Sequence, residues 1–280
     1  MTGKMYGYAR VSSKEQNLNR QLDALAANLP QSLLLTGSDG MGLLTAAKYV
    51  AGDAAAIIQP TDKDGNVSAS GSIKLDSILQ LRQQSRGRAA GRMVFIIDDA
   101  DRMNHRAQNA FLKSLEEPAP QIHFILTSHA PHLLLATILS RVERLRIKQI
   151  SPEQTQQLLR QLKISDPQIE QQLLFLASGK PAALARLAKN PAELEKIGQI
   201  VRDAQQFIRA AGYERAVIAA RYTDRSNALQ FLSHCLTILS NNLRRNPSRG
   251  LIRQSEQIAE TYQRIAANGN VRLQLIALAV

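Results

Sequence analysis

Residues 31–48, QSLLLTGSDGMGLLTAAK, decide how the first part of the chain folds. The apolar run at residues 32–36 predicts a buried strand, because it carries no charge and is followed by glycine. Residues 37–42 predict a glycine-bearing loop, and residues 43–50 have the spacing of a helix. A strand, a glycine loop and a helix in this order form the setting in which backbone N–H groups receive a phosphate.

The loop lacks the side chains that phosphate chemistry requires. Such loops continue with a lysine, which contacts the β and γ phosphates, and with a serine or threonine, whose hydroxyl holds Mg²⁺. This chain has Leu43 and Leu44 there, and apolar side chains give a charged ligand no polar partner. We expect Gly37, Gly40 and Gly42 to belong to a degenerate nucleotide loop. Without the lysine, however, a plain tight turn explains Gly40 and Gly42 better.

The composition favours a helical, basic protein. The 280 residues suffice for two or three domains, and only 4% are aromatic, so leucine, isoleucine and alanine dominate the core. Lys and Arg number 35 against 23 Asp and Glu, a formal charge of +12. This excess indicates a polyanionic partner, nucleic acid first, although solvated basic faces also explain it.

The single cysteine and the lack of long apolar runs exclude several classes of protein. Cys235 is the single cysteine, so no disulfide forms within the chain and no zinc site is built from cysteines. The histidines have no recognised metal spacing, and we expect no metal. No signal-peptide pattern and no apolar run of about 18 residues occurs, so we expect a cytoplasmic protein without a membrane span.

The N-terminal segment resembles another class of protein. Residues 5–25, MYGYARVSSKEQNLNRQLDAL, resemble the start of a serine recombinase (resolvase/invertase) catalytic domain, through Tyr8, Arg10, Val11 and Ser12. The resemblance implies that Ser12 is a nucleophile attacking a DNA phosphate. Such a domain needs roughly a hundred residues to form a core. We therefore interpret residues 1–15 as a leader and expect a helix at about residues 16–28 to open the next domain.

A second strand-end signal lies at residues 92–103, RMVFIIDDADRM. Its apolar residues predict a central strand that delivers Asp98 and Asp99 at its carboxyl end, where ligands bind in parallel sheets. This is similar to a Walker B motif, in which the first carboxylate holds Mg²⁺ and the second orients the attacking water. The alternative is that the two aspartates cap the following helix.

A basic cluster precedes this strand. Residues 73–84 have nearly helical apolar spacing, and arginines follow closely. The candidates for contact with a DNA backbone are Lys74, Arg82, Arg86 and Arg88. A solvated basic face explains the same residues equally well.

The stretch at residues 96–120, IIDDADRMNHRAQNAFLKSLEEPAP, resembles the bacterial clamp-loader ATPases, the gamma/tau and delta-prime subunits of DNA polymerase III. The residues that match that signature are Asp98, Ala100, Asp101, Met103, Ala107, Asn109, Ala110, Leu112, Lys113, Leu115, Glu116, Glu117 and Pro118. The resemblance implies an AAA+ fold: a five-stranded parallel sheet with helices, followed by an all-helical lid and an all-helical collar. The expected domains are residues 16–150, 151–195 and 196–280.

The resemblance also implies roles for single residues. Thr127, at the end of a predicted strand, takes the place of the sensor-1 residue, and Ser140-Arg141 that of the family's S-R-C motif. Arg141 would then act in trans as an arginine finger on the ATP of a neighbouring subunit; a plain surface charge is the alternative. Ala183 stands where the family has its sensor-2 arginine.

Leu43, Leu44 and Ala183 thus replace residues that an ATP-hydrolysing subunit needs. The arginine of the S-R-C motif, Arg141, is retained. The resemblance then implies a delta-prime-type stator, which binds no ATP or Mg²⁺ of its own. Its partners would be gamma/tau-type motor subunits, the delta subunit, the sliding clamp and primer–template DNA, as part of the DNA polymerase III holoenzyme. The alternatives are a serine recombinase acting through Ser12 and a generic basic DNA-binding protein.

Overall fold

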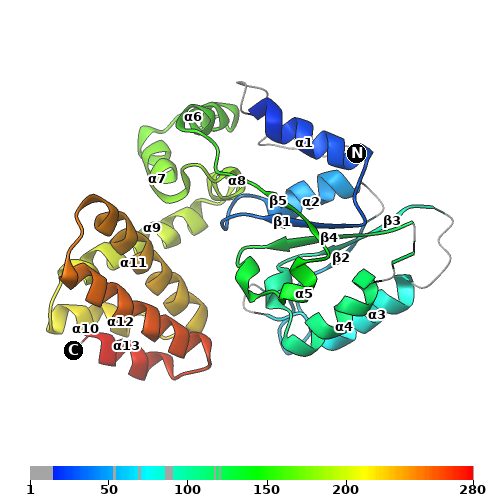
Figure 1. The fold of residues 1–280 in the computed structure, drawn as a ribbon. Coiled ribbons are helices and arrows are strands. Elements are labelled where there is room, and N and C mark those ends of the chain that lie inside the picture. Colours follow the sequence, from blue (N-terminus) through cyan, green and yellow to red (C-terminus); the bar gives the residue numbers. More distant parts are fainter. Residues whose placement is uncertain are drawn as a thin grey trace. The chain divides into compact units, whose positions relative to one another are not determined.

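The computed structural model describes residues 15–52, 55–68, 71–85, 91–116, 118–119 and 121–279. The leader and Ser12 therefore lie outside the described residues. The chain divides into two compact units, Met1–Lys189 and Asn190–Val280. In its described part the first unit combines a sheet with helices, and the second is built from helices (Figure 1).

The sheet of the first unit has five parallel strands in the order β2-β3-β4-β1-β5. The strands are β1 (Ser32–Thr36), β2 (Ala55–Ile58), β3 (Met93–Ile97), β4 (Ile122–Ser128) and β5 (Glu143–Arg146). The predicted α/β class with a five-stranded parallel sheet is confirmed. Because all strands run the same way, their carboxyl ends meet at one edge of the sheet.

Helices cover both faces of this sheet (Figure 1). One face carries α1 (Glu15–Ala27) and α2 (Leu43–Ala51), and the other carries α3 (Leu75–Ser85), α4 (His105–Glu116) and α5 (Ala136–Leu139). Two short 3₁₀ turns link strands to helices: η1 (Ala100–Arg102) lies between β3 and α4, and η2 (Pro131–Leu133) lies between β4 and α5.

Alternating side chains along the strands build a separate core on each face. Leu33 and Leu35 of β1 join the core under α1 and α2, whereas Leu34 joins the core under α3 and α4. In the latter core, Phe124 stacks on Phe95 and meets Phe111 edge-on, with ring centroids 5.9 and 5.4 Å apart. The continuous apolar runs of β1 and β3 thus reflect burial on both faces of the sheet.

Two elements differ from the sequence-based boundaries. The helix expected from residue 73 begins at Leu75, because Ile73 instead bridges to Met103 and donates its N–H to the carbonyl of Arg102 at 3.1 Å. The sequence predicts the fifth strand over residues 144–150, and the structure has it over Glu143–Arg146. It ends there because its partner β1 ends at Thr36, which pairs with Arg146.

Three short helices complete the first unit: α6 (Pro152–Gln161), α7 (Pro167–Ala177) and α8 (Pro181–Lys189). Each begins with a proline at its first position, where the missing N–H costs nothing. Ser151 caps α6 through a capping box with Gln154, and Asp166 caps α7. These helices correspond to the three that the sequence predicts for the lid.

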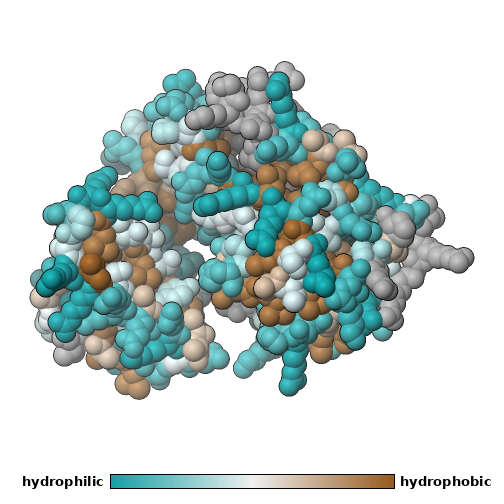
Figure 2. Space-filling view, in the orientation of Figure 1, coloured by the Kyte–Doolittle hydropathy of each residue, from teal (hydrophilic) through white to brown (hydrophobic). Residues whose placement is uncertain are grey.

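The second unit consists of α9 (Pro191–Arg209), α10 (Tyr213–Ala220), α11 (Arg225–Arg245), α12 (Arg249–Ala266) and α13 (Val271–Ala279). Helix α9 continues across residues 195 and 196, where the sequence-based boundary between lid and collar falls. The face of each unit that Figure 2 shows is largely hydrophilic, with small apolar patches. Among the described helices, none has the length and apolar character needed to cross a bilayer.

A buried carboxylate organises the second unit. Asp203 of α9 is 3% exposed and accepts hydrogen bonds from Gln199 (2.8 Å), Arg221 (2.9 Å) and the Tyr222 hydroxyl (2.9 Å). The Tyr222 ring stacks on Phe231 with centroids 4.3 Å apart. Burial, together with the hydrogen bond to Asp203, raises the pKa of Tyr222 far above its ordinary value, so its hydroxyl remains a donor.

Asp203→Ala should lower the free energy of unfolding of the second unit by about 2–3 kcal/mol, because the buried Tyr222 hydroxyl loses its acceptor. The measurement is urea denaturation followed by circular dichroism. The control is Glu195→Ala, which removes an ion pair between exposed Glu195 and Arg202 and should cost less than about 1 kcal/mol. Equal losses in the two variants would contradict this assignment.

Candidate functional site

The phosphate-type loop between β1 and α2 depends on two glycines with positive φ. Gly40 and Gly42 both have φ of 82°, and Gly42 is the N-cap residue of α2. This left-handed backbone is costly for residues that carry a Cβ. The loop therefore has the glycines that its conformation needs, and α2 begins at Leu43 as predicted.

The position expected for a phosphate-binding lysine is filled by a core residue. Leu43 is 2% exposed and packs with Leu35, Ala46 and Val50 in the core under α1 and α2. Leu44 is half-buried, and both leucines line a cavity of about 200 Å³ at the loop. Neither leucine side chain can neutralise a phosphate. A cation that lines this cavity, Arg186, comes from α8 and not from the loop.

The loop is bonded to the first turn of α8. The carbonyl oxygen of Gly40 accepts hydrogen bonds from the N–H groups of Ala182 (3.0 Å) and Ala183 (3.1 Å). A Cβ placed on Gly40 would lie 2.7 Å from the Cβ of Ala183. The small side chain at residue 183 thus permits a close backbone contact, which we call the lid latch, within the first unit.

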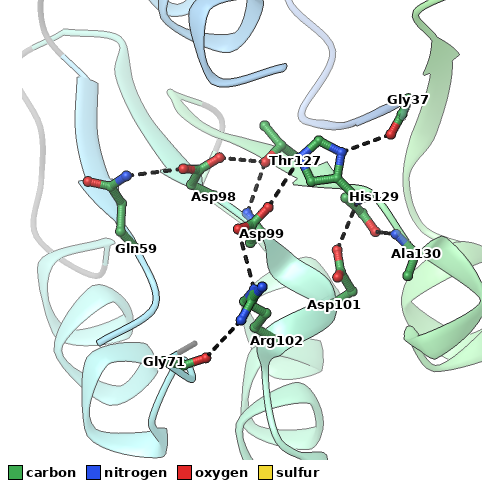
Figure 3. A network of polar contacts seen from close by, with 11 residues as sticks. Gly37, Gln59, Gly71, Asp98, Asp99, Asp101, Arg102, Thr127, His129 and Ala130 are labelled. Carbon is green, nitrogen blue, oxygen red and sulfur yellow. Dashed lines mark hydrogen bonds and ion pairs between the residues drawn. The ribbon is translucent and has the colours of Figure 1, made fainter. Parts of the chain in front are cut away.

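Figure 3 shows a polar network at the carboxyl ends of β2, β3 and β4. Asp98, directly after β3, accepts hydrogen bonds from Thr127 Oγ1 (2.7 Å) and from Gln59 Nε2 (3.1 Å), one at each carboxylate oxygen. Thr127 Oγ1 in turn accepts the N–H of Asp99 at 2.9 Å. Each oxygen of the Asp98 carboxylate therefore accepts one hydrogen bond from a protein donor.

Asp99 lies in the left-handed region, with φ 48° and ψ 52°, at the start of η1. Its side chain makes no capping hydrogen bond there, so the capping alternative is wrong for Asp99. Instead its carboxylate faces Arg102 Nε at 3.4 Å and His129 Nε2 at 3.5 Å. Burial, and next the charge of Asp98, raises the pKa of Asp99 above its ordinary value.

His129 joins the loop to this network, a role that sequence reasoning missed. Its Nδ1 lies 2.9 Å from the carbonyl oxygen of Gly37, and because a carbonyl only accepts, Nδ1 carries the hydrogen. Its backbone N–H donates to Asp101 at 3.1 Å. The available signal was position: Gln59 and His129 each directly follow a strand, β2 and β4, at the edge where ligands bind.

Asp99→Asn should stabilise the protein near neutral pH by up to about 1 kcal/mol, with a smaller gain near pH 4. The raised pKa means that the folded state holds the Asp99 proton more tightly than the unfolded chain. This contribution to stability is present at low pH and is lost as pH rises through the folded-state pKa. Urea denaturation at both pH values measures it, with Asp39→Asn on the exposed loop as control. A loss of stability in Asp99→Asn that is equal at both pH values would contradict the prediction.

Arg141 follows α5 at the surface, and its side chain is 37% exposed. Its Nη1 donates to the carbonyl of Thr137 at 3.0 Å, and its Nη2 lies 3.3 Å from a carboxylate oxygen of Glu116. Arg141 is not among the residues that line the loop cavity. The Arg141 guanidinium is thus partly exposed and bonded to Thr137 and Glu116 of its own unit.

The other candidate positions are dispersed. Lys74 donates to the carbonyl of Asp62 at 3.0 Å, and Arg82 lies in the last turn of α3. Arg86, Arg88 and Ser12 fall outside the described residues. Among the residues that the structure describes, no cluster of three His, Cys, Asp or Glu side chains could hold a metal ion.

The strand order and the polar residues at the sheet's carboxyl edge define an α/β fold of AAA+-like type. Residues 53–151 match the family described as DNA polymerase III, delta subunit. The chain is therefore related to the clamp-loader-type subunits of DNA polymerase III. The matched family region begins at residue 53 and does not reach the recombinase-like segment.

Individual relatives agree with this assignment. The chain is 33% identical to DNA polymerase III subunit delta' of Pseudomonas aeruginosa over 42% of this chain and 36% of that protein. It is 30% identical to subunit tau of Bacillus subtilis over 46% of this chain and 26% of that protein. The chain thus aligns with little more than a third, or less, of these two relatives.

A solved structure extends the likeness in fold to nearly the whole chain. The DNA polymerase III gamma subunit-related protein of Thermotoga maritima superposes with a TM-score of 0.53 at 19% identity, over 92% of this chain and 97% of that protein. At this identity the likeness concerns the fold alone.

Proposed function

We propose that this chain is a delta-prime-type stator subunit of a replicative clamp loader. The observation that carries the proposal is the contrast between Leu43, buried where a motor subunit needs lysine, and Arg141, held at the surface. The first residue denies the chain an ATP site of its own. The second is a guanidinium positioned for the ATP of another subunit, where it would stabilise charge in phosphoryl transfer.

The polar network supports the same role. ATP with Mg²⁺ fits the loop poorly, because Leu43 and Leu44 stand where a lysine and a hydroxyl would contact the phosphates and the metal. Asp98 is instead hydrogen-bonded to Gln59 and Thr127. The lid latch further joins the loop to α8 through two backbone hydrogen bonds to the Gly40 carbonyl. A unit whose loop and α8 are fixed by such hydrogen bonds suits a subunit that does not change conformation as ATP is bound and hydrolysed.

The proposed partners are gamma/tau-type motor subunits, a delta subunit, the sliding clamp and primer–template DNA. The proposed domains are an AAA+ domain at residues 16–150, a lid at 151–189 and a collar that joins the ring. The sequence-based boundary between lid and collar at residues 195 and 196 moves to residue 190, because α9 runs across it and the second unit begins there. Lys74, Arg82, Arg86 and Arg88 remain candidates for contact with DNA phosphates. We further propose a cytoplasmic location, which suits a free thiol at Cys235.

Reconstitution tests the proposal. The full chain is combined with ATP-hydrolysing clamp-loader subunits and a delta subunit, and ATP hydrolysis is measured with primed DNA. Addition of the chain should restore DNA-stimulated hydrolysis to an incomplete ring, while the chain alone should not bind ATP. ATP hydrolysis by the chain alone, or failure to join the ring, would overturn the proposal.

A further inference from the structure

A cavity of about 290 Å³ in the first unit shares no lining residue with the cavity at the phosphate loop. The residues on which its chemistry depends are Arg82, Ser85, Lys113, Ser114, Ile122 and Phe124. They come from the last turns of α3 and α4 and from the first half of β4. The cavity therefore joins two cationic side chains and two hydroxyls to an apolar base.

The cations alone do not make this cavity a site. Arg82 and Lys113 lie in the last turns of their helices, where a helix dipole favours positive charge on its own. No described residue forms an ion pair or hydrogen bond with either charged end. Their presence is thus compatible with a ligand without requiring one.

Ser114 supplies the independent observation. Ser114 is 6% exposed, and its Oγ has no hydrogen-bond partner in the part of the chain that the structure describes. A helical serine commonly satisfies its hydroxyl by bonding a carbonyl one turn back, yet Ser114 does not. Ser114 lines the cavity, and its buried hydroxyl without a partner is a group whose hydrogen bond remains to be accounted for.

We propose that this cavity binds a phosphate group at the end of a nucleic-acid strand or of a free nucleotide. Arg82 and Lys113 would pair with the phosphate charge, and Ser114 Oγ would donate to one phosphate oxygen, a charge-assisted hydrogen bond. Ile122 and Phe124 give the ester carbons an apolar surface. A volume at the lower limit of ligand pockets suits one terminal phosphate ester rather than a continuous backbone.

The proposal is tested on the full chain by fluorescence anisotropy with two labelled oligonucleotides of one sequence, 5′-phosphorylated and 5′-hydroxyl. The phosphorylated strand should bind about 10-fold more tightly. Thymidine 5′-monophosphate and inorganic phosphate serve as competitors. Full competition by the monophosphate assigns the site to free nucleotides, and competition by the phosphorylated strand alone assigns it to strand ends.

Variants distinguish binding in the cavity from non-specific attraction of phosphate to the basic surface of the protein. Ser114→Ala should reduce the preference for the 5′-phosphate by about 5- to 10-fold without lowering the melting temperature, because it removes an unsatisfied hydroxyl. The double variant Arg82→Gln/Lys113→Gln should abolish the preference. Arg106→Gln, an exposed cation at the other end of α4, is the control and should retain it.

Equal binding of the two strands without competition by either small phosphate would overturn the inference, and so would an equal loss of preference in Arg106→Gln. Because binding is measured on the chain alone, this result is independent of ring assembly and of ATP hydrolysis. Failure of the inference would therefore leave the proposed stator function in place.

Discussion

Arg141→Ala should lower DNA-stimulated ATP hydrolysis by about 10³- to 10⁵-fold at the site that Arg141 serves in a reconstituted clamp loader. The physical reason is that an arginine finger stabilises charge on the transferring phosphoryl group only in the transition state. The total loss will be smaller, because other sites in the ring hydrolyse ATP too. Steady-state hydrolysis with primed DNA measures the effect, and gel filtration shows whether the ring still assembles.

Two variants make the test specific. Arg144→Ala removes a neighbouring exposed arginine, which donates to the carbonyl of Leu139 at 2.7 Å, and should leave hydrolysis unchanged. Glu116→Gln weakens the contact that holds the Arg141 guanidinium at 3.3 Å, so hydrolysis should be retained or raised. An assembled ring that contains Arg141→Ala and hydrolyses ATP normally would show that Arg141 is only a surface charge.

Gly40→Val should lower the free energy of unfolding of the first unit by about 4–7 kcal/mol. A β-branched residue at φ 82° is strained by about 1–2 kcal/mol, and the new side chain overpacks against Ala183 at a cost of about 1–3 kcal/mol. The displaced loop also weakens the two hydrogen bonds of the lid latch, at about 1 kcal/mol each. Denaturant unfolding measures the total.

The control for this variant is Gly65→Val, which introduces the same residue at φ 89° with no atom within 4 Å. It should show only the backbone strain of about 1–2 kcal/mol. Hydrogen exchange locates the remainder: the amides of Ala182 and Ala183 should exchange faster in Gly40→Val and normally in Gly65→Val. Equal stability losses in both variants would contradict a close contact between the loop and α8.

The pattern of neighbouring residues in the sequence was sufficient to predict most of the architecture. The uncharged run of β1 predicts Ser32–Thr36, and the apolar run before Asp98 predicts β3 within one residue. The glycine loop and the start of α2 follow from neighbouring residues alone. These features were readable because strand burial, positive φ and helix starts depend on residues close together in the chain.

The sequence predicted only some of the residues of the candidate site. The strand-end rule placed Asp98, Asp99 and Thr127 at one edge of the sheet, and their hydrogen bonds confirm that they meet. The same rule applied to Gln59 and His129 would have found two further members. The sequence alone does not single out these two residues, because an amide and a single histidine match no familiar motif.

The sequence by itself thus determined the strands, the loop shape and the loss of the phosphate-binding lysine at Leu43. Tertiary structure alone decided that His129 bonds to Gly37, 92 residues away, and that the Gly40 carbonyl meets Ala182 and Ala183. Only the fold could also leave the Ser114 hydroxyl buried without a partner. The reason is physical: periodicity records which side of an element is buried, whereas a contact between distant residues depends on how whole elements pack.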